Sequence, residues 1–308
     1  MITQFLTVAQ QVFILFSIIL VGVILGKTHL MNEHVSMGLS NLMIYVVSPC
    51  ALVVAFQRPL EESTFFSFCM ALLASTLIQI AFILVTRLLL RDRDPQRQRI
   101  LQFGTVFSNS GYMGYPLQVA LLGTIGMFYG SAFVIPFTVL TWTYGIYLIT
   151  GDRSKLSFKK LLLNPGMISV FIAMALYLLR ISLPPLLLSP VNYIAQLNTS
   201  VPMLIIGYQL SQADVRKVLK CRTAWFSALL RLLILPTLAL LICLAMHIDG
   251  TVLIALTIAA SAPPAAILVM FSEKFGQDAR FSSSLVSIQT VFSILTMPVI
   301  VGIAQYLA

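Results

Sequence analysis

The chain has 308 residues, of which 59% are hydrophobic and 9% are charged, and its formal net charge is +9. Soluble domains contain about 25% charged residues, so this composition excludes a soluble globular protein and predicts an integral membrane protein. The basic residues lie in short loops beside apolar runs. We therefore attribute the net charge to membrane orientation and to anionic headgroups of the lipid bilayer, rather than to nucleic acid.

Ten apolar stretches follow one another along the chain, each long enough to cross a bilayer as a helix. A β-barrel would instead show short segments of alternating polarity. Because the loops are short throughout, the sequence predicts an all-α membrane protein without a soluble domain. The predicted spans are residues 8–26, 36–56, 65–89, 100–122, 126–149, 163–181, 188–210, 222–246, 250–272 and 281–306.

The positions of the basic residues predict the orientation of these spans. Of the 19 Lys and Arg residues, all but Arg58, Arg180 and Arg231 fall in loops on one side of the ten-span arrangement. Because basic residues are concentrated in cytoplasmic loops, that side is expected to face the cytoplasm. Both termini are then expected on the opposite, periplasmic or extracellular side.

Four prolines indicate that the chain has two related halves. Pro116 and Pro264 are 148 positions apart, and Pro49 and Pro202 are 153 positions apart, so proline-marked spans recur at nearly one offset. The alternative is that these prolines mark ordinary kinks, which many membrane helices contain.

An odd number of spans in each half has a topological consequence. Residues 1–151 and 152–308 each contain five predicted spans, so the two halves insert in opposite orientations. The sequence therefore predicts two inverted repeats, with residues 151–160 as the linker.

Two spans are predicted to be broken helices. Residues 109–116 in the fourth span include two glycines and a proline, which disfavour continuous helix, and residues 261–264 in the ninth span include two prolines. Open backbone inside a membrane is stable only where protein buries it or where it lines a wet cavity. Broken helices at matching places in two repeats are typical of transporter binding sites.

The chemistry of these breaks predicts a site for a carboxylate. Half-helices beginning near Pro116 and Pro264 would direct unpaired N–H groups and positive dipole ends toward the site. Asn109 adds an amide that can donate or accept. For Tyr112 and Tyr115, the alternative to substrate binding is packing. For Ser261, the alternative is a hydroxyl that bonds to its own helix. The other candidate residues are Tyr112, Gly114, Tyr115 and Ser261 for binding and Pro263 for the crossover.

Arg231 lies inside the eighth predicted span, where an ionisable residue is a functional candidate. It would balance an anionic substrate or take the place of a coupling cation. The alternative is that it snorkels to the cytoplasmic surface. Gln79, Gln209 and Gln289 are uncharged candidates for lining the cavity or for joining helices.

The sequence contains no set of residues typical of an enzyme or a metal site. It has no nucleophile with a matching base, no phosphate-binding loop and no metal-ligand spacing, so neither a catalytic residue nor a cofactor is predicted. It also has no Asp or Glu inside the spans that would carry a proton or bind sodium.

The motif Asn109-x-x-x-x-Gly114-x-Pro116, the proline-bearing break at residues 261–264, and Arg231 with Pro236 resemble the auxin efflux carrier family. This family includes bacterial organic-acid transporters and the plant PIN transporters. The resemblance covers the whole chain in length, span count and orientation. Because the chain lacks the long central cytoplasmic loop of the plant proteins, it looks like a bacterial member, in the inner membrane.

The resemblance implies a fold shared with sodium/proton antiporters and bile-acid symporters, in which spans 4 and 9 cross at Pro116 and Pro264. It implies a scaffold of spans 1, 2, 6 and 7 that forms a homodimer, and a transport domain of spans 3–5 and 8–10 that moves like an elevator. Asn109 matches the asparagine that binds a carboxylate, and Arg231 matches a residue that supports the crossover. An acid to pair with Arg231 is missing from the third span.

The expected function is therefore secondary transport of a small organic anion, a carboxylate such as malate or malonate, by alternating access. One alternative is a sodium-coupled organic-anion symporter of the bile-acid type. Another is a channel or a membrane sensor that does not transport.

Overall fold

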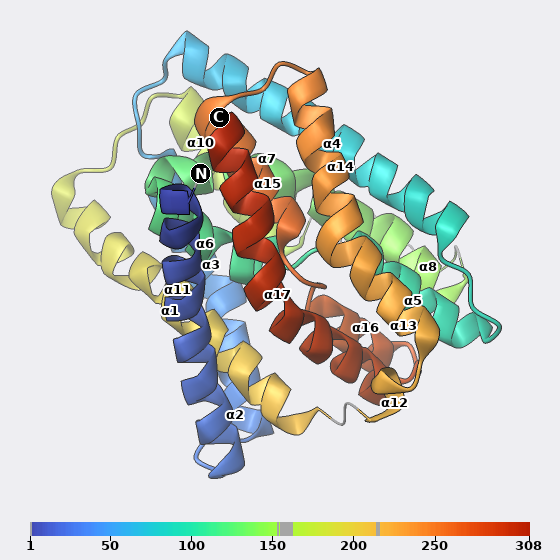
Figure 1. The fold of residues 1–308 in the computed structure, drawn as a ribbon. Helices are drawn as coiled ribbons and strands as arrows, with labels where there is room; N and C mark the ends of the chain where they lie inside the picture. The colour runs from blue at the N-terminus through green and yellow to red at the C-terminus, as the bar shows by residue number, and fades with distance from the viewer. Residues whose placement is uncertain (1, 153, 155–162, 214–215) are drawn as a thin grey trace.

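The computed structural model describes residues 2–152, 154, 163–213 and 216–308, which form a bundle of helices (Figure 1). Secondary structure in these ranges is helical apart from one isolated β-bridge. Residues 153 and 155–160 of the predicted linker lie outside the described residues.

The helices lie where the apolar stretches predict them, and their ends differ from the predicted ones by a few residues. The first half contains α1 (Ile2–Lys27), α2 (Glu33–Leu42), η1 (Met43–Val47), α3 (Ser48–Phe56), α4 (Glu62–Leu89), α5 (Pro95–Val106), η2 (Ser110–Gly114), α6 (Tyr115–Leu122), α7 (Thr124–Leu140), η3 (Thr141–Gly145) and α8 (Ile146–Thr150). The second half contains α10 (Pro165–Leu178), α11 (Pro185–Gln212), α12 (Arg216–Leu219), α13 (Arg222–Leu229), η5 (Leu230–Ile234), α14 (Leu235–Ala245), α15 (Gly250–Ser261), α16 (Ile267–Lys274) and α17 (Ala279–Leu307). The η elements are wide, π-helical turns.

Six helical runs in the described chain are long and apolar enough to cross a membrane. Two shorter apolar helices, α10 and α15, accompany them. The structure is therefore that of an all-α, multi-pass membrane protein. The six long runs are Leu6–Lys27, Glu33–Phe56, Glu62–Leu89, Thr124–Thr150, Arg222–Ala245 and Ala279–Leu307.

Three of the wide turns have the same cause. The turns η1, η2 and η5 each end two residues before a proline, at Pro49, Pro116 and Pro236 respectively. A proline ring collides with the carbonyl four residues earlier, and a wider turn moves that carbonyl aside while the helix continues. These prolines therefore widen helices and do not themselves end them.

Hydrogen bonds join the loops into two separate sets. In one set, the Gln57 side chain donates to the carbonyl of Ile181 (3.3 Å) and accepts from the N–H of Leu183 (2.8 Å). Arg58 donates to the hydroxyl of Thr124 (3.3 Å). These bonds join the connections α3–α4, α6–α7 and α10–α11.

The second set lies at the basic end of the bundle. Arg99 donates to the carbonyl of Thr150 (3.2 Å), and Asp92 accepts a hydrogen bond from Thr223. These contacts join the α4–α5 loop, the end of α8 and the start of α13. Each set contains only connections that the ten-span arrangement places on one side of the membrane.

Asp92 is the centre of this basic end. Its carboxylate accepts from Nη2 (2.6 Å) and Nε (3.0 Å) of Arg97, and its side chain is only 1% exposed. Burial by itself raises the pKa of Asp92, but the hydrogen bonds to its carboxylate outweigh this effect and lower the pKa from its ordinary 3.8 to about 2. The ionised carboxylate thus fastens the α4–α5 loop to α13.

Helices α1 and α11 make the most extensive helix–helix contact of the bundle. Gly22 and Gly207 lie where their backbones meet. A Cβ added to Gly207 would lie 2.1 Å from the carbonyl oxygen of Ile19, and one added to Gly22 would lie 2.4 Å from that of Leu204. The contact therefore requires glycine at both positions, as is typical of helix pairs in membranes.

We expect Gly207→Ala to separate α1 from α11 and to lower the free energy of unfolding by about 1–3 kcal/mol, because the collision is with rigid backbone. The unfolding temperature of the purified protein in detergent measures this effect. Gly38→Ala is the matched control, since a Cβ there meets nothing within 4 Å. Equal unfolding temperatures for the two variants would contradict this account of the contact.

Asp92→Asn should destabilise the protein at neutral pH by on the order of 1–2 kcal/mol, after allowing for the partial exposure of Arg97. Because the pKa is lowered by folding, the carboxylate contributes fully above about pH 4, and its contribution is lost as the pH falls through about 2. The difference in unfolding temperature between wild type and variant should therefore shrink over that range. Asp249→Asn, at an exposed helix cap without a side-chain bond, should show no such change.

Candidate functional site

The two broken helices meet through their open backbones. The N–H of Asn109 donates to the carbonyl of Pro263 (2.7 Å), and the N–H of Ala265 donates to the carbonyl of Phe107 (2.9 Å). Ser108 and Pro264 form the antiparallel bridge between these bonds. Ser108 and Pro264 face each other without exchanging a hydrogen bond. Pro264 therefore needs no N–H at this position, and proline is tolerated there.

The two breaks differ in how they relate to the prolines that predict them. One second half-helix begins at Ser110, before the predicted start near Pro116, and the other begins at Ile267, just after Pro264. Pro116 lies inside α6, which continues the helix that starts with the wide turn η2. Pro264 lies in the break itself, three residues before α16. The expected start near Pro116 is therefore corrected to Ser110, and the expected start near Pro264 to Ile267.

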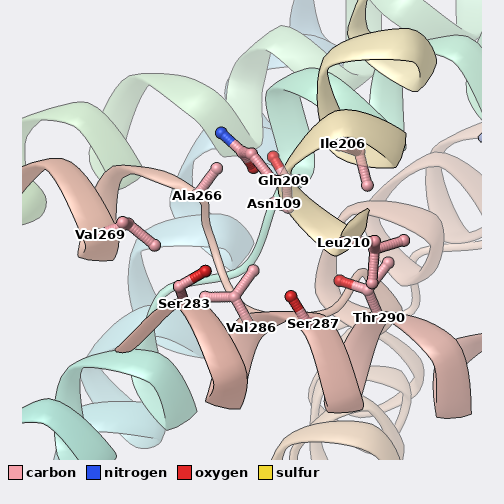
Figure 2. Close-up of a pocket in the computed structure, with 10 residues that line it drawn as sticks. All are labelled: Asn109, Ile206, Gln209, Leu210, Ala266, Val269, Ser283, Val286, Ser287 and Thr290. Atoms are coloured by element: carbon pink, nitrogen blue, oxygen red, sulfur yellow. The ribbon is translucent and has the colours of Figure 1, made fainter. Parts of the chain in front are cut away.

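A pocket lies beside this crossing, between the crossover, α11 and α17 (Figure 2). Its volume is about 10 Å³, which leaves room for about one water molecule. No charged side chain lines it. The lining residues are Asn109, Ile206, Gln209, Leu210, Ala266, Val269, Ser283, Val286, Ser287 and Thr290.

The five polar side chains of the pocket share an unusual property. Within the described chain, none of them forms a hydrogen bond through its side chain, although several are almost fully buried (Asn109 is 7% exposed, Ser287 4% and Thr290 1%). Buried polar groups normally have a partner, so unpaired ones that face a common cavity indicate a binding site. These side chains are Asn109, Gln209, Ser283, Ser287 and Thr290.

Two helix N-termini also open at this pocket. Asn109 is the N-cap residue of η2, and Ala266 is the N-cap residue of α16. The first N–H groups of a helix have no partner within it, and its dipole is positive at that end. Because both N-cap residues line the same pocket, the site favours a negatively charged group.

Arg231 lies where the first half-helices, α5 and α15, end and where their last carbonyls have no partner within the helix. Its guanidinium donates to the carbonyls of Thr105 (3.1 Å) and Val106 (3.2 Å) at the end of α5, and to the carbonyl of Ala260 at the end of α15. It has no exposed area, so the snorkelling alternative is wrong. One cation thus binds the negative ends of both broken helices.

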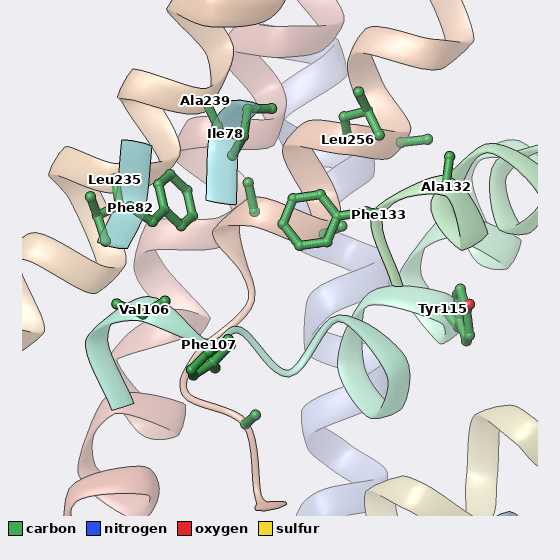
Figure 3. Packing of buried hydrophobic residues seen from close by; sticks show 14 of the residues in the cluster. Ile78, Phe82, Val106, Phe107, Tyr115, Ala132, Phe133, Leu235, Ala239 and Leu256 are labelled. Carbon is green, nitrogen blue, oxygen red and sulfur yellow. The ribbon is translucent and has the colours of Figure 1, made fainter. Parts of the chain in front are cut away.

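Phe82 of α4 lies beside Arg231. The Arg231 guanidinium carbon lies 5.3 Å from the centre of the Phe82 ring, which packs with Val106 and Leu235 near the crossover (Figure 3). Among the described residues, Arg231 forms no salt bridge. Its charge is therefore balanced by backbone carbonyls and an aromatic face instead of a carboxylate.

The remaining predicted residues lie near the crossing but do not line the pocket. Tyr115 is buried in the apolar core on another face (Figure 3), and Tyr112 packs partly buried among apolar residues. Gly114 faces Ala259, whose Cα lies 3.7 Å from the place where a Cβ on Gly114 would be. The Ser261 hydroxyl donates to the carbonyl of Ile258 (3.1 Å) in its own helix.

The residues of α17 in the pocket escaped the sequence reasoning, although a signal for them exists. Ser283, Ser287 and Thr290 are spaced by four and three positions, which places them on one face of α17. Gln209 lines the pocket, whereas Gln79 and Gln289 donate to Phe133 and Ser227 and join helices. No group of three or more potential metal-binding side chains occurs in the described ranges.

A multi-pass helical protein whose two broken helices meet beside a buried polar pocket belongs to the class of membrane transport proteins. The family model described as a membrane transport protein matches residues 7–159 and residues 152–301. The chain belongs to this family, the auxin efflux carrier family, so the predicted resemblance is confirmed. An uncharacterized transporter of Methanocaldococcus jannaschii is 22% identical over 301 residues, which cover 93% of this chain and 95% of that protein. The family is one of transporters, not of enzymes.

We expect Arg231→Met to lower the free energy of unfolding by about 3–5 kcal/mol, because it leaves three buried carbonyls without a donor. Arg231→Lys keeps the charge but lacks the planar fork, so an intermediate loss is expected. Unfolding temperatures in detergent measure both. The control is Arg222→Met, at the exposed start of α13. An Arg231→Met variant as stable as this control would show that the crossover does not depend on the guanidinium.

Proposed function

We propose that this protein is a secondary transporter of small organic anions, carboxylates such as malate or malonate. The observation that supports this most directly is the pocket, which combines two helix N-termini with five unpaired polar side chains. Asn109 would bind the carboxylate by its amide, and N–H groups at the starts of η2 and α16 would complete the site. Arg231 would act only as a support for the crossover.

We further propose ten membrane crossings arranged as two inverted repeats, residues 1–151 and 152–308, as in the sodium/proton antiporter and bile-acid symporter fold. The two sets of loop hydrogen bonds support this topology, because each set joins connections of one predicted side. We also propose a bacterial inner membrane as the protein's location, and the positions of the basic residues support an orientation with both termini on the outer side.

An elevator-type movement is the proposed mechanism. The scaffold would consist of α1, α2–α3, α10 and α11, and the transport domain of the remaining helices. One part of the contact between the scaffold and the transport domain is an apolar cluster, which supports sliding. It consists of Val8, Val12, Leu15, Ile19, Met203 and Ile206 on α1 and α11, against Met113, Leu117, Ile258, Ala262, Met297 and Val301. We propose that the scaffold also forms a homodimer.

The position of the pocket supports access from the cytoplasm in this conformation. It touches the last turns of α11, the first turn of α16 and the first turns of α17, all on the basic side of the crossover. The apolar contact between α1, α11 and the transport helices lies toward the other side. Since the pocket holds about one water molecule, the two domains must move apart before a carboxylate enters.

Flux of labelled malate and malonate into liposomes that contain the purified protein tests this function. Wild type should give saturable flux that responds to membrane potential, since each charge moved is worth about 2.3 kcal/mol per 100 mV. Asn109→Ala should lower the flux by about ten-fold or more, because a hydrogen bond to a charged group contributes about 1.5–3 kcal/mol.

Two controls make this test specific. Asn198→Ala removes a buried asparagine of α11 that is not in the pocket, and it should leave flux near wild type. On α17, Ser287→Ala should reduce flux, whereas Ser293→Ala should not, because the Ser293 hydroxyl bonds to Thr290 in its own helix. Flux that is unchanged in Asn109→Ala would move the substrate site elsewhere. Flux only with sodium would indicate the symporter alternative, and binding without flux would indicate a sensor.

A further inference from the structure

The charges around the pocket add up to about one elementary positive charge. No Lys, Arg, Asp, Glu or His lines it. Each helix N-terminus is equivalent to roughly +0.5 charge, and two of them open here. The guanidinium of Arg231 bonds to the carbonyl ends of α5 and α15, so its charge offsets the negative ends of those helices.

The charged and titratable groups described on the surrounding helices lie outside the pocket lining, so the positive charge around the pocket comes from the two helix N-termini. Tyr112 and Tyr208 are neutral side chains that do not line the pocket. The groups at the ends of α16 and α17 are exposed to solvent, and both signs are represented. These are Glu273, Lys274, Asp278 and Arg280.

We propose that the pocket binds its carboxylate substrates as monoanions. This inference rests on the function proposed above. A monocarboxylate binds as it is, and a dicarboxylate binds after one of its two carboxylates has taken up a proton. A second ionised carboxylate would be buried without a counter-charge, which is strongly unfavourable.

The polar groups of the pocket suit the protonated carboxyl group as well. The amides of Asn109 and Gln209 and the hydroxyls of α17 can each donate to a carbonyl oxygen and accept from an acid O–H. A lysine or arginine would only donate. With a dicarboxylate, a proton therefore crosses the membrane on the substrate, and the protein needs no buried carboxyl group of its own to carry it, in keeping with the lack of Asp and Glu inside the spans.

The pH dependence of flux tests this inference in proteoliposomes of wild-type protein. Malonate and lactate are compared between about pH 8 and about pH 6, where lactate is always a monoanion. Malonate flux should rise about ten-fold for each unit by which the pH falls, in proportion to its singly protonated form. Lactate flux should stay constant within about two-fold. A pH-sensitive dye inside the liposomes should record one proton entering with each malonate and none with lactate.

Malonate flux that is independent of pH, or that rises with pH, would overturn the monoanion inference and leave the proposed function intact. The absence of flux for both acids would instead overturn the proposed function. The two failures are thus distinguishable.

A charge-adding variant extends the test. Gln209→Lys introduces a positive charge at a half-buried position of the pocket and should let the malonate dianion bind, so that most of the pH dependence is lost. Gln212→Lys makes the same change at an exposed position three residues further along α11, outside the pocket, and should behave as wild type. Full pH dependence in a folded Gln209→Lys protein would overturn the inference.

Discussion

The bonds of the Arg231 guanidinium to three backbone carbonyls hold the centre of this molecule together. A helix that stops inside a membrane leaves its last carbonyls without partners, and no water is available to replace them. Here two helices stop at the same place, and one planar cation bonds to the ends of both. The short backbone ladder around Ser108 and Pro264 adds two hydrogen bonds between the broken segments, to the carbonyls of Pro263 and Phe107. Both breaks therefore depend on a single side chain from a third helix.

This arrangement separates the two kinds of helix end. The negative ends of α5 and α15 face Arg231 and the ring of Phe82. The positive ends that begin at Asn109 and Ala266 face the pocket instead. The proposed anion site would thus be formed by backbone dipoles and neutral polar side chains, without a lysine or arginine in the lining. A strong fixed charge would hold an anion tightly, whereas diffuse dipoles allow it to be released, which is what a transporter requires.

The packing around the crossing is of two kinds, and each suits a different part of the proposed elevator movement. Where α1 meets α11, glycines bring the backbones into contact and make a rigid unit. Where these two helices meet the crossover helices, the buried contact consists of Val, Leu, Ile, Met and Ala side chains. A surface of apolar side chains has no directional bonds to break when it shifts, so movement along it is less costly than movement within the rigid unit.

The sequence by itself determined the features that depend on local pattern. Apolar runs of sufficient length mark the helices, the basic loops mark one side, and the glycines and prolines around Asn109 and Pro264 mark the breaks. Only the tertiary structure decided which side chains share the pocket, because Asn109, Gln209 and Ser287 come from three segments far apart in the chain. It also decided that Tyr115 packs into the core and that Arg231 bonds to carbonyls instead of reaching the surface. Residue type and spacing define the face of a helix, but the neighbour that covers that face is set by long-range packing.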